Sequence, residues 1–278
     1  MIANLLRKSV QLVPWKYRQR IKDWPLVAPA QRWMVDRFLG HGSFLHTIDA
    51  GPAKGLRIWI ELPEDKALWT GAYEAKFSAA LAGGVRRGDV CYDVGAYRGF
   101  FAGVCALVGA SAVHIFEPLP ANISRIQSLI EANPALPLTL HPFALGAEVG
   151  ETEFAVMPEA SMGKLSGSSF QHDARSKEML RVGIETLDHL RDAGAIPLPN
   201  IIKIDVEGAE AMVLRGAQRL FSESRPRLFI EIHSRALGRE CAEILTGHEY
   251  DVNTLETGAK PDFRTEPEVC HFIGASRC

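Results

Sequence analysis

Short runs rich in β-branched residues alternate with amphipathic stretches through most of the chain beyond residue 85. The pattern predicts strands at 90–94, 112–116, 138–145, 201–206 and 228–232. Helices are predicted between and after them, at 100–108, 121–132, 209–220 and 236–245. This alternation is typical of a parallel sheet that is covered by helices on both faces. We therefore expect an α/β core of the doubly wound, Rossmann-like kind.

The end of the chain departs from this alternation. Strands predicted at 251–255 and 269–274 leave no room between them for a crossover helix of normal length. They should therefore pair as a hairpin, with one strand antiparallel to the rest of the sheet. A nicotinamide-binding sheet is usually parallel to its last strand, whereas methyltransferase sheets add a terminal hairpin of this kind.

The segments before and within the core have weaker patterns. Turn residues predict a hairpin over 45–62, and the apolar spacing over 68–85 predicts a helix that Gly83 and Gly84 end. An extra strand is expected at 153–157, and the Ser- and Gly-rich stretch 161–175 is interpreted as a mobile loop. We expect a basic helical N-terminal extension (1–44) and one catalytic domain (45–278), whose core is 85–278.

Composition and charge refine this picture. The 278 residues are 47% hydrophobic, enough for one sizeable core, and the five scattered cysteines indicate free thiols in a reducing compartment. No apolar run is long enough to cross a bilayer, and no signal peptide is evident at the start. These features predict a soluble cytoplasmic protein.

The N-terminal extension is strongly basic. Residues 1–40 contain eight Lys or Arg and two Asp, a net charge of +6, so the remainder carries −8 of the formal total of −2. One interpretation is peripheral contact with an anionic inner membrane surface, helped by apolar residues such as Trp15 and Trp24. The other is a pair of solvated amphipathic helices packed on the body. Pro14, Pro25 and Pro29 favour the second, because they break the segment into short pieces.

A glycine turn at 93–99 lies between the first core strand and the first core helix. Gly95 lets the backbone turn tightly and approach a ligand, and Gly99 lets the helix start close to the sheet. The spacing G-x-x-x-G differs from the dinucleotide pattern G-x-G-x-x-G, and it places Tyr97 and Arg98 where a pyrophosphate needs bare backbone. The turn therefore favours a ligand without phosphates.

Glu117 follows the second core strand, 18 residues beyond Gly99. An acidic residue at this place can accept hydrogen bonds from both ribose hydroxyls of a nucleoside. The alternative is a glutamate that caps a helix or forms a salt bridge, just before Pro118. Together with the glycine turn, Glu117 indicates an adenosine ligand.

Polar residues also end the fourth and fifth core strands. Asp205 and Glu207 come after the fourth, and Glu231 and His233 close the fifth, where ligands bind in open α/β sheets. Strand alternation puts Glu231 and His233 on the same side. His233 or Asp205 is our candidate for a general base, the alternative being a structural histidine.

The same side chains suggest a second chemistry. With Asp205 and Glu231 as its main ligands, a divalent cation could orient a hydroxyl group of the acceptor. Lys203 and Arg215 could instead neutralise these carboxylates as ordinary ion pairs, in which case no metal is needed.

An ordered series of motifs carries a resemblance to a known family. The motifs are WTGAYE (69–74), RGDVCYDVGAYRG (87–99), IFEPLPAN (115–122), ALG (144–146), ETLD (185–188), IKIDVEGAEAMVLRGA (202–217) and FIEIH (229–233). Over roughly 69–252 the chain resembles the FkbM family of methyltransferases. The resemblance implies a class I methyltransferase fold, S-adenosylmethionine as methyl donor, and usually O-methylation of glycans or natural products. One departure is Tyr97, where the family commonly has Asn.

The resemblance and the strand positions together imply a set of site residues. Cofactor contacts are expected from Glu74, Asp93, Gly95, Ala96, Tyr97, Gly99, Glu117 and Pro118, with the backbone near Ala144 beside the adenine. The catalytic candidates remain Asp205, His233, Glu207 and Glu231. The expected acceptor is a hydroxyl of a sugar, a glycan or a related polar metabolite, and no nucleic-acid partner is expected.

Two rival functions belong to other classes. A nicotinamide-dependent sugar-modifying enzyme predicts a G-x-G-x-x-G turn and a Tyr-x-x-x-Lys pair, and the sequence contains neither. A membrane-associated protein that binds S-adenosylmethionine without turnover would keep the cofactor pocket and the basic extension. The sequence does not set the oligomeric state.

Overall fold

The computed structural model describes residues 43–62, 65–70, 73–156, 163–165 and 178–277. The N-terminal extension predicted at 1–44 lies almost entirely outside the described residues, so both interpretations of its charge stay predictions. Among the described residues, no helix has the length and apolar character needed to span a membrane.

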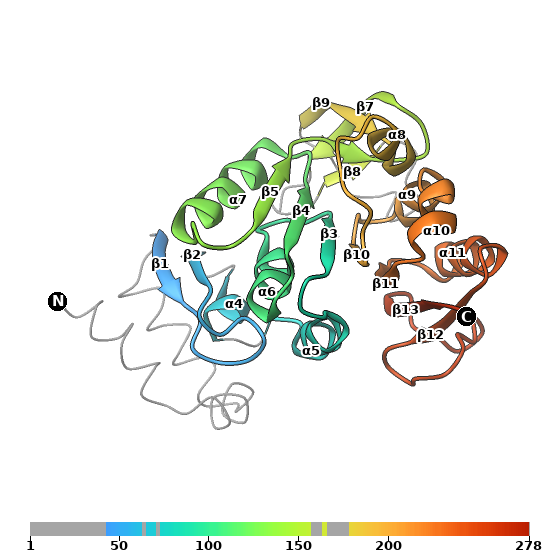
Figure 1. Ribbon diagram of the computed structural model, residues 1–278, viewed down its shortest axis with the longest axis horizontal. Helices are drawn as coiled ribbons and strands as arrows, with labels where there is room; N and C mark the ends of the chain where they lie inside the picture. Colours follow the sequence, from blue (N-terminus) through green and yellow to red (C-terminus); the bar gives the residue numbers. More distant parts are fainter. Residues whose placement is uncertain (1–42, 63–64, 71–72, 157–162, 166–177, 278) are drawn as a thin grey trace.

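A seven-stranded sheet forms the centre of the protein (Figure 1). Its strands are β3 (Val90–Val94), β4 (Ala112–Phe116), β5 (Leu138–His141), β10 (Ile201–Ile204), β11 (Arg227–Ile232), β12 (Tyr250–Thr254) and β13 (Cys270–Ser276). They lie in the order β12-β13-β11-β10-β3-β4-β5. Only β13 runs antiparallel to its neighbours, β11 and β12, and the other described pairings are parallel. The predicted terminal hairpin and the class I methyltransferase architecture are both confirmed.

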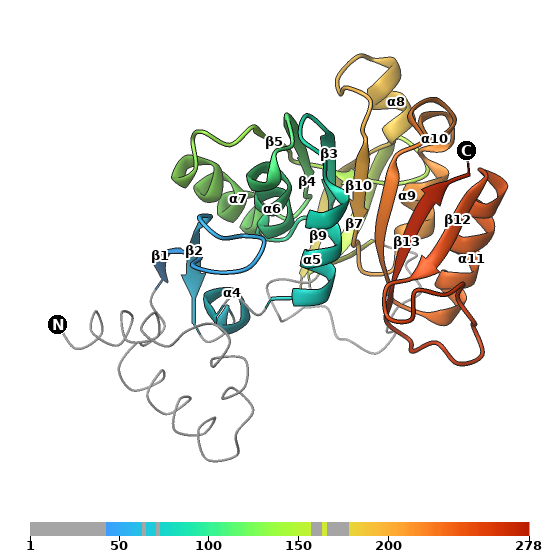
Figure 2. The same ribbon diagram turned by 60° about the horizontal axis from the view of Figure 1, so that its bottom comes forward.

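Helices cover both faces of this sheet (Figure 2). On one face lie α5 (Ala75–Gly84), α6 (Phe100–Val108) and α7 (Pro120–Ala132), and on the other α8 (Leu187–Asp192), α9 (Glu210–Arg215), α10 (Gln218–Ser224) and α11 (Arg235–Gly247). Strand alternation divides the core accordingly. Ile201 and Phe229 pack with α5 and α6, whereas Ile202 and Ile230 pack on the opposite face.

Three expected elements are each divided in two. The helix expected over 68–85 is α4 (Lys66–Thr70) and α5, with Glu74 in the left-handed region at φ 38° before α5. The helix expected over 209–220 is α9 and α10, which separate at Gly216. A Cβ there would lie 2.0 Å from the Gly146 carbonyl oxygen, so the backbones meet too closely for a side chain.

The third divided element is the strand expected over 138–145. Its first part, β5, ends at His141 and stays in the central sheet, whereas Ala144–Leu145 forms β6 in a second sheet. That four-stranded sheet has the order β6-β9-β7-β8, with β7 (Gly150–Val156), β8 (Gly163–Leu165) and β9 (Glu178–Glu185). The extra strand expected at 153–157 corresponds to β7. The sequence pattern did not predict β9, and most of the expected 161–175 loop lies outside the described residues.

The expected hairpin over 45–62 is confirmed. Its strands are β1 (Ser43–Thr47) and β2 (Arg57–Glu61), which pair antiparallel with Leu45 opposite Trp59. β2 contacts α4 and α7, and Phe44 of β1 packs against Trp69 of α4. Strand order reverses between β3 and β10, which is where open α/β sheets bind ligands.

Candidate active site

The glycine turn connects β3 to α6 in the expected manner. Gly95 and Gly99 have φ values of 71° and 73°, which L side chains rarely adopt. A Cβ on Gly95 would lie 1.8 Å from the Asp205 carbonyl oxygen, so the turn packs directly on the end of β10. This close approach joins the two predicted halves of the site through their backbones.

Glu117 holds the glycine turn from the next strand. One of its carboxylate oxygens accepts a hydrogen bond from the Tyr97 backbone N–H at 2.9 Å, and the other from that of Leu119 at 3.0 Å and from the Asn122 amide at 3.3 Å. Burial raises the pKa of Glu117 to about 7, against the opposing effect of the N–H donors. Glu117 therefore organises both the turn and the start of α7, and its role toward a ribose stays a prediction.

Asp93, one of the expected cofactor contacts, has a buried side chain. Its carboxylate is 1% exposed, accepts a hydrogen bond from the Ala102 backbone N–H at 2.9 Å, and lies 3.1 Å from the Lys203 ammonium. The side chain thus points to α6 and β10, and its role toward the cofactor stays a prediction. Of the other expected cofactor contacts, Ala144 is buried in β6 beside Leu119.

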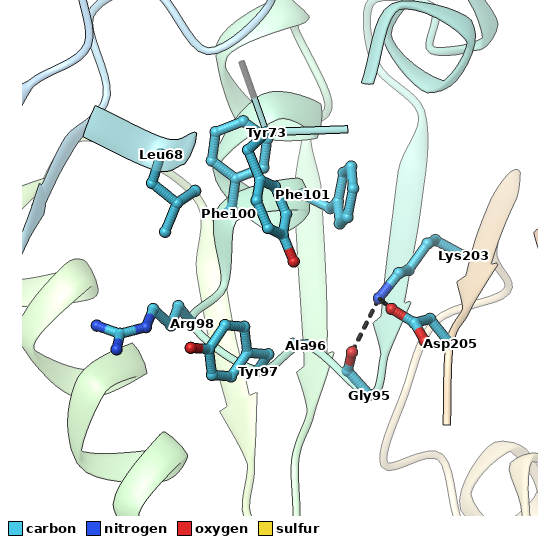
Figure 3. A pocket seen from close by; sticks show the side chains of 10 residues that line it. All are labelled: Leu68, Tyr73, Gly95, Ala96, Tyr97, Arg98, Phe100, Phe101, Lys203 and Asp205. Atoms are coloured by element: carbon cyan, nitrogen blue, oxygen red, sulfur yellow. Dashed lines mark hydrogen bonds and ion pairs between the residues drawn. The ribbon is translucent and has the colours of Figure 1, made fainter. Parts of the chain in front are cut away.

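A pocket opens on the glycine turn (Figure 3). It is lined by Leu68, Tyr73, Gly95, Ala96, Tyr97, Arg98, Phe100, Phe101, Lys203 and Asp205. In Figure 3 the Tyr73 side chain reaches toward the turn, and Arg98 points away from Lys203. The pocket therefore has an aromatic wall on one side and the Asp205 carboxylate on the other.

Strained backbone gathers around this pocket. Five described residues other than glycine have positive φ, and three of them are Glu74 (38°), Tyr97 (53°) and Glu207 (54°). Such conformations cost energy and cluster at functional sites. At Tyr97 the turn is also anchored by its neighbour Arg98, whose buried guanidinium pairs with Asp65 at 2.6 Å.

His233 faces the predicted carboxylates. Its Nδ1 lies 2.9 Å from the Glu210 carboxylate, and its Nε2 lies 3.4 Å from Glu207, 3.7 Å from Asp205 and 3.8 Å from Glu231. Burial lowers the pKa of His233, but the bond and charge of Glu210 and the other carboxylates outweigh it, so the pKa rises to about 9. The four predicted catalytic residues therefore lie close together, and the surrounding carboxylates favour the protonated form of His233.

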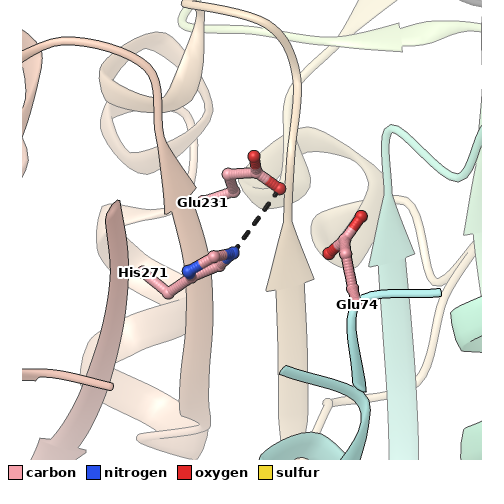
Figure 4. Close-up of side chains that lie close together, drawn as sticks. All are labelled: Glu74, Glu231 and His271. Atoms are coloured by element: carbon pink, nitrogen blue, oxygen red, sulfur yellow. Dashed lines mark ion pairs between the residues drawn. The ribbon is translucent and has the colours of Figure 1, made fainter. Parts of the chain in front are cut away.

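Glu231 also belongs to a neighbouring group (Figure 4). It lies 3.8 Å from His271 Nε2, and burial together with the charges of Asp205 and Glu74 raises its pKa to about 8. Potential ligand atoms of Glu74, Glu231 and His271 all lie within 4.8 Å of one another, as do those of Asp205, Glu231 and His233. Groups of this kind could hold a divalent cation.

Sequence reasoning missed two side chains that organise the site. Glu210, fully buried, holds His233 and also accepts a hydrogen bond from the Gly208 backbone N–H at 3.0 Å. Lys203 was considered only as a neutralising charge. A charged residue within the otherwise apolar strand Ile201–Ile204 was the signal that could have singled it out.

Comparison with known proteins agrees with this geometry. Residues 93–257 match the family model described as the methyltransferase FkbM domain. The hexuronic acid methyltransferase AglP of Haloferax volcanii is 26% identical over 175 residues, which are 63% of this chain and 69% of that protein.

The chain also aligns with solved structures of methyltransferases. The chain aligns with the methyltransferase FkbM from Methylobacillus flagellatus at a TM-score of 0.45 and 20% identity, covering 75% of this chain and 52% of the other. This chain thus spans about half the length of that protein. Fibrillarin from Aeropyrum pernix, solved with natively bound S-adenosyl-L-methionine, aligns at a TM-score of 0.43 and 15% identity, covering 71% and 72% of the two chains.

Proposed function

The chain belongs to the FkbM family of methyltransferases, and from this premise we propose that it transfers a methyl group from S-adenosylmethionine to a hydroxyl of a sugar or a related polar acceptor. The observation that carries the proposal is the contact between the glycine turn and the end of β10. It places a predicted nucleoside-binding turn beside a carboxylate that lines the same pocket.

The residues present fit the cofactor. The bare backbone at Gly95, and the Glu117 carboxylate that binds the Tyr97 N–H of the same turn, would hold the nucleoside half. Tyr97, which lines the pocket, and Glu74, which precedes α5, would meet the methionine half. When bound, the cofactor supplies an electrophilic methyl group on a positively charged sulfur.

Asp205 is the proposed proton acceptor, because it lines the pocket and His233 does not. In the proposed step the acceptor oxygen forms a bond to the methyl carbon, the carbon–sulfur bond breaks, and the hydroxyl proton passes to the Asp205 carboxylate. The enzyme's main contribution is then to align the oxygen and to exclude water. His233, held by Glu210, keeps the carboxylates of the site in place.

Two substitutions test this assignment. Asp205→Asn should lower kcat about 10²- to 10⁴-fold at saturating cofactor, the usual contribution of a general base. Asp251→Asn, the same change on β12 at a half-exposed carboxylate paired with Arg277, should leave kcat unchanged. Similar rates for both variants would refute the role of Asp205.

The acceptor class is tested with the isotopically labelled cofactor. Purified protein is incubated with fractionated glycans, lipids and proteins, and the labelled product is treated with mild alkali. A methyl ether on a hydroxyl survives this treatment, whereas a methyl ester on a carboxyl group is hydrolysed. Alkali-labile label on an acidic sugar would contradict transfer to a hydroxyl.

A divalent cation is a further candidate, favoured by the spacing of Asp205, Glu231 and His233. It would polarise the acceptor hydroxyl and so assist the loss of its proton. Turnover that stops in EDTA and returns with Mg²⁺ or Mn²⁺ would support this role, and turnover unaffected by EDTA would exclude it.

A further inference from the structure

Lys203 is a fully buried cation in the middle of the central sheet. Its side chain is 2% exposed, and the rest of its strand is isoleucine. Burying an ammonium group is costly unless nearby acceptors compensate for the lost water. A lysine at this position therefore needs a full set of partners.

The sheet register supplies these partners at the site. Lys203 lies directly opposite Asp93 on β3, and its ammonium is 3.1 Å from that carboxylate. It also donates a hydrogen bond to the Gly95 carbonyl oxygen at 2.8 Å and lies 3.4 Å from the Asp205 carboxylate. The Phe101 ring, with its centre 5.2 Å away, covers the ammonium from the α6 side. The ammonium thus forms a hydrogen bond with the glycine turn and ion pairs with carboxylates on β3 and β10.

Without a cation, the Asp93 and Asp205 carboxylates and the Gly95 carbonyl oxygen would be unfavourable neighbours. Two carboxylates and a carbonyl oxygen repel one another, and the repulsion is strong where water is scarce. Two of the three belong to groups with proposed roles in the reaction. Gly95 would contact the cofactor, and Asp205 would accept the proton.

We propose that Lys203 is a positioning residue that fixes the cofactor-binding turn and the Asp205 carboxylate relative to each other. This inference rests on the proposed methyl transfer. It adds that one buried ammonium couples cofactor binding to the orientation of the base. A purely structural lysine would affect only the stability of the fold.

The test uses an Asp93→Asn background. Lys203→Met in the natural chain leaves the buried Asp93 carboxylate without its cation, which could prevent folding. Asp93→Asn alone keeps the Lys203 contacts with Gly95 and Asp205. The double variant Asp93→Asn, Lys203→Met removes those two contacts without leaving an unpaired buried charge. Arg227→Met is the control, because it breaks the Arg227–Asp89 ion pair near the amino ends of β11 and β3.

Three quantities are measured for each variant: the free energy of unfolding, the Kd of S-adenosylmethionine by calorimetry, and kcat at saturating cofactor. Relative to Asp93→Asn, the double variant should bind the cofactor at least about tenfold more weakly and lower kcat by a further factor of about 10 to 100, as expected when reacting groups shift by about 1 Å. Arg227→Met should lower only the free energy of unfolding.

The comparison of the double variant with Asp93→Asn decides between a positioning role and a structural role for Lys203. If the double variant matches Asp93→Asn within about twofold in Kd and kcat, Lys203 has only a structural role and the inference is overturned. A double variant that does not fold, while Asp93→Asn does, also overturns it, because Lys203 is then required for the fold itself. Failure of the natural chain to bind the cofactor would instead refute the proposed function.

Discussion

Replacing Gly95 with alanine tests the contact on which the site depends. An alanine at φ 71° costs about 1–2 kcal/mol, because L residues avoid the left-handed region. The added Cβ would also lie 1.8 Å from the Asp205 carbonyl oxygen, well inside the 3.0 Å limit that real Cβ contacts respect. Because the clashing atom belongs to the backbone, the turn itself must move, at a further cost of about 1–3 kcal/mol.

Gly51→Ala is the matched control. Gly51 has φ 76°, and a Cβ there would have no heavy atom within 4 Å. Gly51→Ala should therefore lower the free energy of unfolding by only about 1–2 kcal/mol, and Gly95→Ala by about 2–5 kcal/mol in total. A domain in the upper part of the ordinary range of about 5–15 kcal/mol survives either change.

The assay combines urea denaturation with calorimetry of S-adenosylmethionine binding. Gly95→Ala should weaken the cofactor's binding at least about tenfold, because the turn is displaced, and Gly51→Ala should leave it unchanged. Equal effects of the two substitutions on stability and on binding would show that the turn does not pack against β10 in the way described.

Three further predictions concern pH, strain and charge. Burial lowers the pKa of His141 to about 4 from its ordinary 6.5. The stability that its neutral form provides is therefore complete above pH 6.5 and is lost as the pH falls toward 4. When the free energy of unfolding is measured in urea at pH 7 and at pH 5, His141→Phe should show a smaller decrease between the two than the natural chain does. Tyr97→Asn should raise the free energy of unfolding by up to about 1 kcal/mol in urea denaturation, because Asn tolerates φ 53° better than Tyr. Arg98→Met should lower it by about 3 kcal/mol by leaving the buried Asp65 uncompensated, whereas Arg181→Met, which breaks an exposed pair, should change it by less than about 1 kcal/mol.

The core fold was predictable where the apolar pattern and its boundaries are sharp. The first strand, first helix and second strand were expected at 90–94, 100–108 and 112–116, the bounds that the structure has. Glycines mark both ends of the first helix, which makes its limits readable in the sequence.

The misplaced boundaries have causes that no local pattern signals. Glu74 breaks a helical stretch by adopting a left-handed conformation, which is uncommon for a residue other than glycine. The strand at Ala144–Leu145 changes sheets because it pairs with β9, a segment about forty residues later in the chain. Contacts between distant segments decide both features.

The candidate site shows the same division. Because carboxyl ends of neighbouring parallel strands meet at one edge, the sequence predicted that Asp205, Glu231 and His233 would lie close together. The sequence did not predict that the Asp93 side chain points toward α6 and Lys203, because that direction depends on pairing with Lys203 across the sheet. Strand position therefore located the site, and the cross-strand register determined which side chains line it.

The charges of the proposed reaction suit a pocket that combines aromatic rings with the Asp205 carboxylate. The cofactor brings a positive charge, and Asp205 has a negative one. When the methyl group and the proton have moved, both charges are gone. A reaction that removes two opposite charges is favoured where water cannot stabilise them separately. The aromatic wall of Tyr73, Phe100 and Phe101 provides such surroundings, and burial raises the pKa of Tyr73, so its hydroxyl stays neutral. In the proposed reaction these apolar residues would assist the transfer, because they limit the access of water to the reacting groups.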